Sequence, residues 1–135
     1  MFRLHHVNIT THDVPGLNEF YKRALPLEQL PLPDLHQGAS GLGVSFLSAG
    51  DPEWLQVHIA SQRIGLEREL GHYVNPVERG HIAFRCDDIK AIMARLDRAG
   101  IYYSDYGEWA VPGWHQIYFK DPLGNVIEVQ QKLRG

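Results

Sequence analysis

The sequence predicts an α+β fold made of two copies of a β-α-β-β-β module, and two observations support this prediction. The first is an internal repeat, because residues 6–14 (HVNITTHDV) match residues 81–89 (HIAFRCDDI) in kind at a constant offset of 75 residues. The second is a change after each copy from helical spacing of apolar residues to the alternation typical of strands. Modules of roughly 60–70 residues are marginal alone. We therefore expect one domain over residues 1–135, with module one at about 1–75 and module two at about 76–135.

Each copy of the repeat begins as a strand and continues as a helix. The helices are predicted over residues 15–25 and 89–99, where apolar side chains recur at helical spacing. Asp13 and Asp88 precede the helices, and their carboxylates can accept hydrogen bonds from the unpaired amides of a first turn. Gly100 is placed to end the second helix.

Strands follow each helix. Residues 28–40, which contain two prolines, are predicted to form a loop, and residues 65–79 connect the modules with room for a short helix. Residues 121–124 (DPLG) are the expected turn of a hairpin. The segments with strand-like alternation are residues 41–47, 55–60, 101–103, 115–120 and 125–130.

Composition excludes several classes of protein. With 13 Lys and Arg against 16 Asp and Glu, the net charge of −3 argues against a nucleic-acid or anionic-membrane binder. No apolar run approaches 18 residues, and the start (MFRLHHVNI) does not resemble a signal peptide. A single cysteine indicates a reducing compartment, and we expect the cytoplasm. Because eight histidines accompany that one cysteine, a metal site would have imidazole and carboxylate ligands.

Strand alternation predicts which side chains share a face of the sheet. His6, His58, His81 and Glu128 fall on one face, and His6 and His81 occupy the same position of the repeat. His5 alternates with them and is expected on the apolar face. A polar face exposed to solvent would give the same pattern without any function. The other polar residues of this face are Asn8, Gln56, Arg85, Gln116, Tyr118 and Gln130.

The chain resembles the vicinal oxygen chelate superfamily, which includes glyoxalase I, extradiol dioxygenases, methylmalonyl-CoA epimerase and bleomycin-binding proteins. The resemblance covers essentially the whole chain. Its most specific parts are residues 4–7 (LHHV) with Asp13 and the Phe-Tyr pair at 20–21, then residues 80–84 (GHIAF) and 121–129 (DPLGNVIEV).

This resemblance implies a fold and a metal site. The two modules would form a cup-shaped mixed sheet with helices on its outer face. One divalent metal (Zn, Fe, Ni or Mn) would lie inside the cup on His6, His58, His81 and Glu128. Such a metal would chelate neighbouring oxygens of a small substrate, polarise a carbonyl and stabilise an enolate. Asn8, Gln56, Arg85, Gln116 and Gln130 are the expected substrate-binding residues.

Three functional hypotheses follow from the resemblance. The leading one is a metal-dependent lyase, isomerase or dioxygenase in which Glu128 or His58 assists proton transfer. The second is a non-catalytic antibiotic-binding protein that uses the same cup. The third is an extradiol dioxygenase with Fe(II) on His6, His81 and Glu128, in which His115 and Tyr118 resemble the acid/base pair.

The sequence leaves the substrate and the reaction open. At the position of His58 glyoxalase I has a carboxylate or an amide, so the likeness does not extend to isomerisation of glutathione hemithioacetals. Small members of the superfamily usually dimerise, and we expect a homodimer with a small-molecule substrate and neither nucleic-acid nor membrane partners. Some members build each cup from two chains, and the sequence fits either arrangement.

Overall fold

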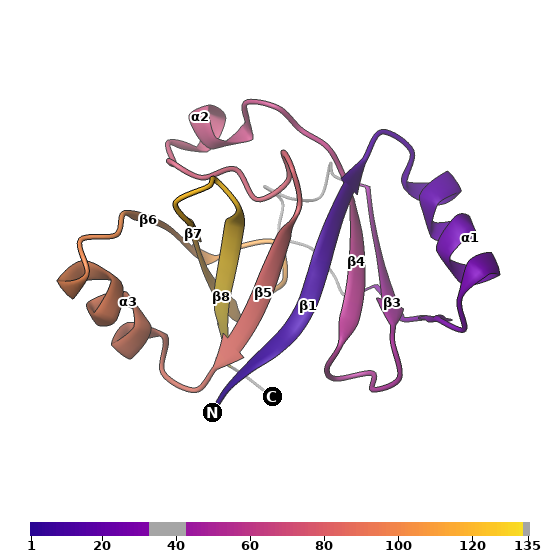
Figure 1. Ribbon diagram of the computed structural model, residues 1–135, viewed down its shortest axis with the longest axis horizontal. Helices are drawn as coiled ribbons and strands as arrows, with labels where there is room; N and C mark the ends of the chain where they lie inside the picture. The colour runs from indigo at the N-terminus through magenta and orange to yellow at the C-terminus, as the bar shows by residue number, and fades with distance from the viewer. Residues whose placement is uncertain (33–42, 134–135) are drawn as a thin grey trace.

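The computed structural model describes residues 1–32 and 43–133. Module one contains strands β1 to β4 and helix α1, module two contains strands β5 to β8 and helix α3, and helix α2 lies between the modules (Figure 1). The elements in chain order are β1 (Phe2–Thr11), α1 (Val14–Ala24), β2 (Glu28–Gln29), β3 (Val44–Ser48), β4 (Gln56–Ser61), α2 (Leu66–Leu70), β5 (His81–Cys86), α3 (Ile89–Arg98), β6 (Tyr103–Glu108), β7 (Trp114–Lys120) and β8 (Val126–Lys132).

All the strands join in one mixed sheet with the order β2-β3-β4-β1-β5-β8-β7-β6. Each module contains one parallel pair, β1 with β4 and β5 with β8. The two modules meet where β1 runs antiparallel to β5. The order is therefore symmetric about the β1–β5 pair, which confirms the predicted α+β fold of two β-α-β-β-β modules.

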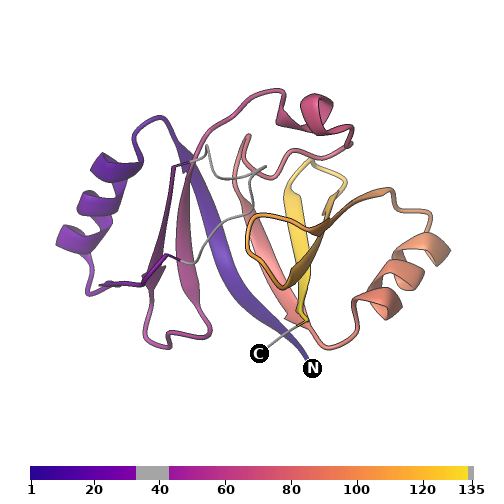
Figure 2. The same cartoon turned by 180° about the vertical axis from the view of Figure 1, so that it is seen from behind.

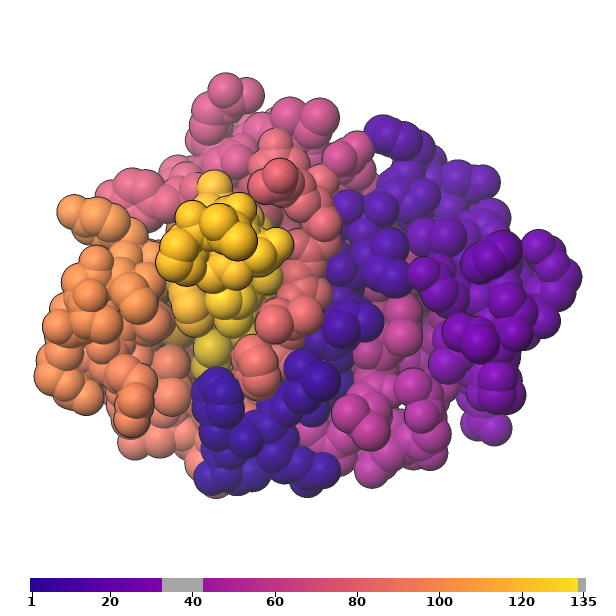
Figure 3. Space-filling model, in the orientation of Figure 1, coloured from indigo at the N-terminus to yellow at the C-terminus, as the bar shows by residue number. Residues whose placement is uncertain are grey.

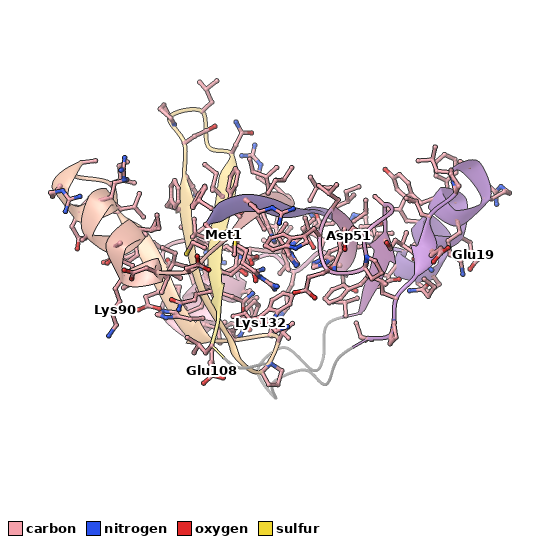
Figure 4. All side chains as sticks on the ribbon, turned by 90° about the horizontal axis from the view of Figure 1, so that it is seen from below. Met1, Glu19, Asp51, Lys90, Glu108 and Lys132 are labelled. Carbon is pink, nitrogen blue, oxygen red and sulfur yellow. The ribbon has the colours of Figure 1, made fainter. Side chains whose placement is uncertain are left out.

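The two long helices lie at opposite flanks of the curved sheet, as Figures 1 and 2 show from its two sides. Both begin at the predicted aspartates. The Asp13 carboxylate accepts from the amide of Gly16 over 2.9 Å, and the Asp88 carboxylate accepts from the amide of Ala91 over 3.2 Å. Figure 4 looks along the sheet, with Glu19 on α1 and Lys90 on α3 at its two ends.

One apolar core cluster lies between helix α3 and the sheet. Ile89 and Leu96 of α3 are buried against Ile117 of β7 and Val129 of β8. These two strand residues alternate with side chains that face the opposite side of the sheet. Packing of one face against α3 therefore fixes which β7 and β8 side chains point into the concave face.

Two details differ from the sequence-based expectations. Strand β6 spans residues 103–108 rather than 101–103. The two-residue strand β2 lies within the segment predicted as a loop, because Glu28 and Gln29 pair with β3. The rest of that loop from residue 33 and the predicted start of β3 at residues 41–42 lie outside the described residues. Helix α2 confirms the short helix expected between the modules.

Across residues 1–32 and 43–133, no helix has the length and apolar character needed to cross a membrane.

Candidate metal centre

Three of the predicted ligand residues come together at the centre of the sheet. His6 of β1, His81 of β5 and Glu128 of β8 lie on three adjacent strands and direct one ligand atom each into a group within 4.8 Å. Glu128 Oε1 is 3.0 Å from His81 Nε2 and 3.7 Å from His6 Nε2. Both modules of one chain contribute, so a single chain contains the complete group.

A backbone contact fixes the orientation of the His81 ring. His81 Nδ1 lies 2.8 Å from the carbonyl oxygen of Pro76. Because a carbonyl only accepts, Nδ1 carries the proton and donates it. The lone pair of Nε2 then faces Glu128, which is the arrangement that ligand histidines adopt in metal sites.

The Glu128 carboxylate is buried and held by two donors. The Tyr118 hydroxyl donates to Oε1 over 3.0 Å, and Gln130 Nε2 donates to Oε2 over 3.0 Å. Burial alone would raise the pKa of Glu128. The contacts with His6, His81 and Tyr118 outweigh burial and lower the pKa from 4.5 to about 2. Glu128 is therefore an ionised, preoriented ligand.

These three residues fit a divalent metal. His81 Nε2 and Glu128 Oε1 are 3.0 Å apart, and a divalent cation held by both atoms would satisfy the lone pairs that face each other there. Tetrahedral ligands at about 2.1 Å from an ion are about 3.4 Å apart, and the measured separations of 3.0 and 3.7 Å bracket this value. Two imidazoles and one carboxylate suit Zn or Fe, and three protein ligands leave positions for substrate.

The structure places His58 beside this group but not within it. The His58 ring is stacked between the rings of His6 and Phe46, with centroids 3.7 Å away on each side. Because the His58 and His6 rings are stacked with planes that differ by only 21°, an ion bound in the plane of the His6 ring would not lie in the plane of the His58 ring. His58 Nε2 instead lies 2.7 Å from Oε1 of Gln56, one of the predicted substrate-binding residues.

His5 departs from the strict alternation that the sequence suggests. Leu4 pairs with Phe84 and His6 pairs with Ala83, so His5 is the extra residue of a β-bulge in β1. The bulge turns His5 toward His6, and the two Nδ1 atoms are 2.8 Å apart. His5 is almost completely buried, as expected, but it lies beside the metal group, formed by the candidate ligands His6, His81 and Glu128, rather than on the apolar face.

A cavity of about 60 Å³ opens above the metal group. Among the described residues, four buried side-chain atoms lack a hydrogen-bond partner, and three of them belong to residues that line this cavity. They are the donors Asn8 Nδ2 and Trp109 Nε1 and the acceptor Gln116 Oε1. A pocket with unpaired polar atoms and a mostly apolar wall surface is typical of a site for a small polar ligand. Trp109 was not among the predicted site residues, because it lies just beyond β6 with no alternation to place it.

The orientation of Gln116 follows from the charge on Glu128. Since an ionised carboxylate only accepts, Tyr118 must donate to Glu128 and receive its own hydrogen bond from Gln116 Nε2, at 3.2 Å. Gln116 Oε1 is therefore the free acceptor.

Two of the predicted substrate-binding residues lie behind the ligand group. Arg85 donates through Nε to Gln130 Oε1 and through Nη1 to the Glu53 carboxylate, both over 2.9 Å. Gln130 in turn donates to Glu128. Arg85 and Gln130 thus support the carboxylate, and the structure does not place them on the cavity wall.

The structure does not bring His115 to the metal group. On β7, Trp114, Gln116 and Tyr118 line the cavity, so His115 points to the opposite face. Its Nε2 lies 2.8 Å from the Asp105 carboxylate at the molecular surface. The expected pairing of His115 with Tyr118 is therefore absent from the described geometry. His12 is exposed and His36 lies outside the described residues.

Comparisons with known proteins agree with this architecture. The family model of the glyoxalase/bleomycin resistance protein/dioxygenase superfamily matches residues 5–119. The Arabidopsis thaliana protein Glyoxylase I 4 is 27% identical over 133 residues, which cover 93% of this chain and 68% of that protein.

Solved structures show the same fold. A variant of Streptomyces coelicolor methylmalonyl-CoA epimerase, in complex with 2-nitronate-propionyl-CoA, superposes with a TM-score of 0.70 at 19% identity over 98% of both chains. The epimerase of Mycobacterium tuberculosis gives a TM-score of 0.65 at 17% identity over 98% of this chain and 89% of that one. Because the family model spans most of the sequence, the chain belongs to the glyoxalase/bleomycin resistance protein/dioxygenase superfamily, the vicinal oxygen chelate group that its repeat resembles.

Proposed function

We propose that this protein is a metal-dependent enzyme that binds neighbouring oxygens of a small substrate on a divalent metal held by His6, His81 and Glu128. The observation that carries the proposal is that His6 Nε2, His81 Nε2 and Glu128 Oε1 converge on one buried point below a cavity. His58, the fourth predicted ligand, lines the same cavity without joining that point.

The metal and the residues around this point have separate roles in the proposed reaction. A divalent metal in this position supplies a Lewis acid that polarises a carbonyl oxygen and favours an enolate. Asn8 and Trp109 present unpaired donors to substrate oxygens, and Gln116 presents an acceptor to a substrate hydroxyl or amide. The cavity surface is mostly apolar, and a substrate seated in it would displace water, which strengthens each of these polar contacts.

We assign proton transfer to His58 rather than to Glu128. Glu128 is a proposed metal ligand, and both of its oxygens already accept hydrogen bonds from Tyr118 and Gln130. Burial lowers the pKa of His58 well below its ordinary value, so its ring is neutral at pH 7 and can accept a proton. His58→Gln should therefore abolish turnover while metal stays bound.

Metal analysis of protein purified without chelator tests the proposal. We expect about one divalent ion per chain, as in catalytic sites with three protein ligands, and loss of this ion in His81→Ala. The matched control is His12→Asn, which changes an exposed histidine and should leave the metal content intact. A metal content below about 0.3 ion per chain that is the same in His81→Ala would contradict the proposed metal site.

A second candidate function is an Fe(II)-dependent oxygenase. The two histidines and one carboxylate form the ligand set of non-haem Fe(II) oxygenases. Without His115 at the cavity, however, the acid/base pair that extradiol chemistry implies is incomplete, so we favour isomerase, epimerase or lyase chemistry. Oxygen uptake with catechols by the Fe(II)-loaded protein distinguishes the two.

The substrate can be narrowed by a screen. Catechols, methylglyoxal–thiol adducts, fosfomycin with thiols and methylmalonyl-CoA each present two neighbouring oxygens and represent different activities of the superfamily. A ligand that binds equally well with and without metal and is never converted would instead support a non-catalytic binding protein.

We also propose a homodimer through the convex face of the sheet. Phe2, Leu4 and Ile82 are each 42–50% exposed on β1 and β5, and Phe2 stacks on Phe84 with ring centroids 5.1 Å apart. In Figure 3 these two strands run exposed between the flanking helices. A contiguous apolar strip of this kind is typical of a protein interface.

A further inference from the structure

The β-bulge in β1 places two consecutive histidines on the same side of the sheet. Ordinary alternation would point His5 and His6 to opposite faces, but the bulge leaves His5 without a partner on β5. Both rings are buried, and their Nδ1 atoms lie 2.8 Å apart. Bulges of this kind commonly redirect a side chain next to an active site.

The positions of the ring protons follow from the neighbouring groups. Burial lowers the pKa of His5, whereas the backbone of Glu53 raises it, which is the effect of a carbonyl that accepts a hydrogen bond from the ring. Since His5 Nδ1 faces His6, the nitrogen that donates to this carbonyl is Nε2. A neutral imidazole carries one proton, so His5 Nδ1 is an acceptor and His6 Nδ1 must donate to it. The lone pair of His6 Nε2 is then directed toward Glu128.

We propose that His5 is a positioning residue that holds His6 in the tautomer and orientation required for a metal ligand. The proposal rests on the metal centre proposed above. His6 and His81 occupy equivalent positions of the two modules, and each donates its Nδ1 proton to a local acceptor. Module two uses the carbonyl of Pro76, whereas module one uses the ring of His5.

The alternative role for the His5 and His6 rings is that they bind a second metal ion. His5, His6 and His58 also form a group whose ligand atoms lie within 4.8 Å, so they could hold a second ion. The guanidinium of Arg85 lies 4.7 Å from the ring of Trp114, which in turn contacts His5 with centroids 5.4 Å apart. This nearby positive charge opposes a second cation and favours the hydrogen-bonded pair.

The decisive experiment is ¹⁵N NMR of the histidine rings in metal-free wild-type protein at pH 7.5, with His6 assigned by comparison with His6→Gln. We expect His6 to carry its proton on Nδ1 and to have an unprotonated Nε2. A proton on His6 Nε2 would overturn the proposal. Because no metal is present, this result stands even if the proposed metal-dependent activity fails.

Two substitutions extend the test to metal binding. His5→Leu removes the acceptor, and we expect zinc affinity to fall roughly 10- to 100-fold, as for other residues that orient ligands. His5→Asn keeps a carbonyl oxygen near the position of Nδ1 and should restore the affinity to within about threefold of wild type. Equal losses in both variants would indicate a packing role only. Two zinc ions per wild-type chain would assign His5 to a second metal site instead.

Discussion

Tyr118 and Glu128 face each other directly across β7 and β8, and the Tyr118 hydroxyl donates to Glu128 Oε1 over 3.0 Å. The same oxygen faces the nitrogens of both candidate ligand histidines. Burial and the neighbouring carboxylate raise the pKa of Tyr118 well above its ordinary value, so the hydroxyl keeps its proton. Tyr118 therefore acts as a fixed donor that orients the carboxylate.

Tyr118→Phe should weaken metal binding without removing it. The substitution deletes one of the two side-chain donors to Glu128 and leaves the other, Gln130, in place. We expect zinc affinity to fall about 10-fold or more and the free energy of unfolding to fall by roughly 1.5–3 kcal/mol, the value of a hydrogen bond to a charged group. Competition titration with a chelating dye and urea unfolding measure the two effects.

The matched control for this substitution is Tyr102→Phe, which removes a hydroxyl from a side chain that is 86% exposed. It should alter neither zinc affinity nor stability. If Tyr118→Phe bound zinc as tightly as wild type, Glu128 would not depend on this donor for its orientation.

Metal-free protein should lose stability when the pH falls from 7.5 to 5. Burial and the nearby charge of Arg85 lower the pKa of His5 from 6.5 to about 4, and burial lowers the pKa values of His6 and His58 well below 6.5. Between the pKa of a histidine in the folded chain and its pKa in the unfolded chain, the unfolded chain binds more protons, so stability decreases with decreasing pH. His5 alone accounts for about 2 kcal/mol at pH 5.

Urea unfolding in the presence of a chelator at pH 7.5, 6 and 5 measures this loss. In His5→Asn the difference between pH 7.5 and pH 5 should shrink by about 2 kcal/mol. His12→Asn, at an exposed position, should retain the full difference. A stability that is constant over this range would mean that these rings are not buried in the neutral form.

Much of the candidate site could be predicted because strand alternation is a local property. The repeat and the alternation placed His6, His81 and Glu128 on one face, and packing of the opposite face against α3 makes that assignment firm. Alternation failed at His5, because a bulge depends on the pairing with β5 and leaves no trace in the residues of β1 themselves. His58 was assigned to the correct face, but the direction of its ring depends on stacking with Phe46 and bonding to Gln56. The carbonyl of Pro76 is a backbone group, and no residue pattern could have identified it.

The proposed dimer should dissociate when charge is placed on the convex face of the sheet. The double variant Leu4→Glu/Ile82→Glu would bury two carboxylates of each chain at the interface. Burial of carboxylates that have no cationic partner is strongly unfavourable. We expect wild type to sediment as a dimer and the variant as a folded monomer with an unchanged circular dichroism spectrum. Leu123→Glu, at an exposed hairpin turn, is the control. A wild-type monomer at micromolar concentration would contradict this interface.

The unpaired donor of Asn8 predicts a substitution that separates stability from function. Asn8 Nδ2 is buried in the cavity with no partner, and an unsatisfied buried donor costs about 1–3 kcal/mol. Asn8→Val removes this donor with a residue well suited to a central strand. The ligand-free variant should therefore be as stable as wild type or more stable by up to about 1 kcal/mol.

Ligand binding should change in the opposite direction. Acetohydroxamate carries two neighbouring oxygens and serves as a probe for zinc-loaded protein. Calorimetry should show that the probe binds Asn8→Val roughly 5- to 10-fold more weakly than wild type, because one hydrogen bond to a ligand oxygen is lost. Thr10→Val, on the same strand beyond the cavity lining, should leave probe affinity unchanged. Destabilisation of the ligand-free Asn8→Val protein by more than about 1 kcal/mol, with unchanged probe affinity, would show that Asn8 supports the fold instead. The combination of retained stability and weakened binding is specific to a side chain whose hydrogen bond is completed only by a ligand.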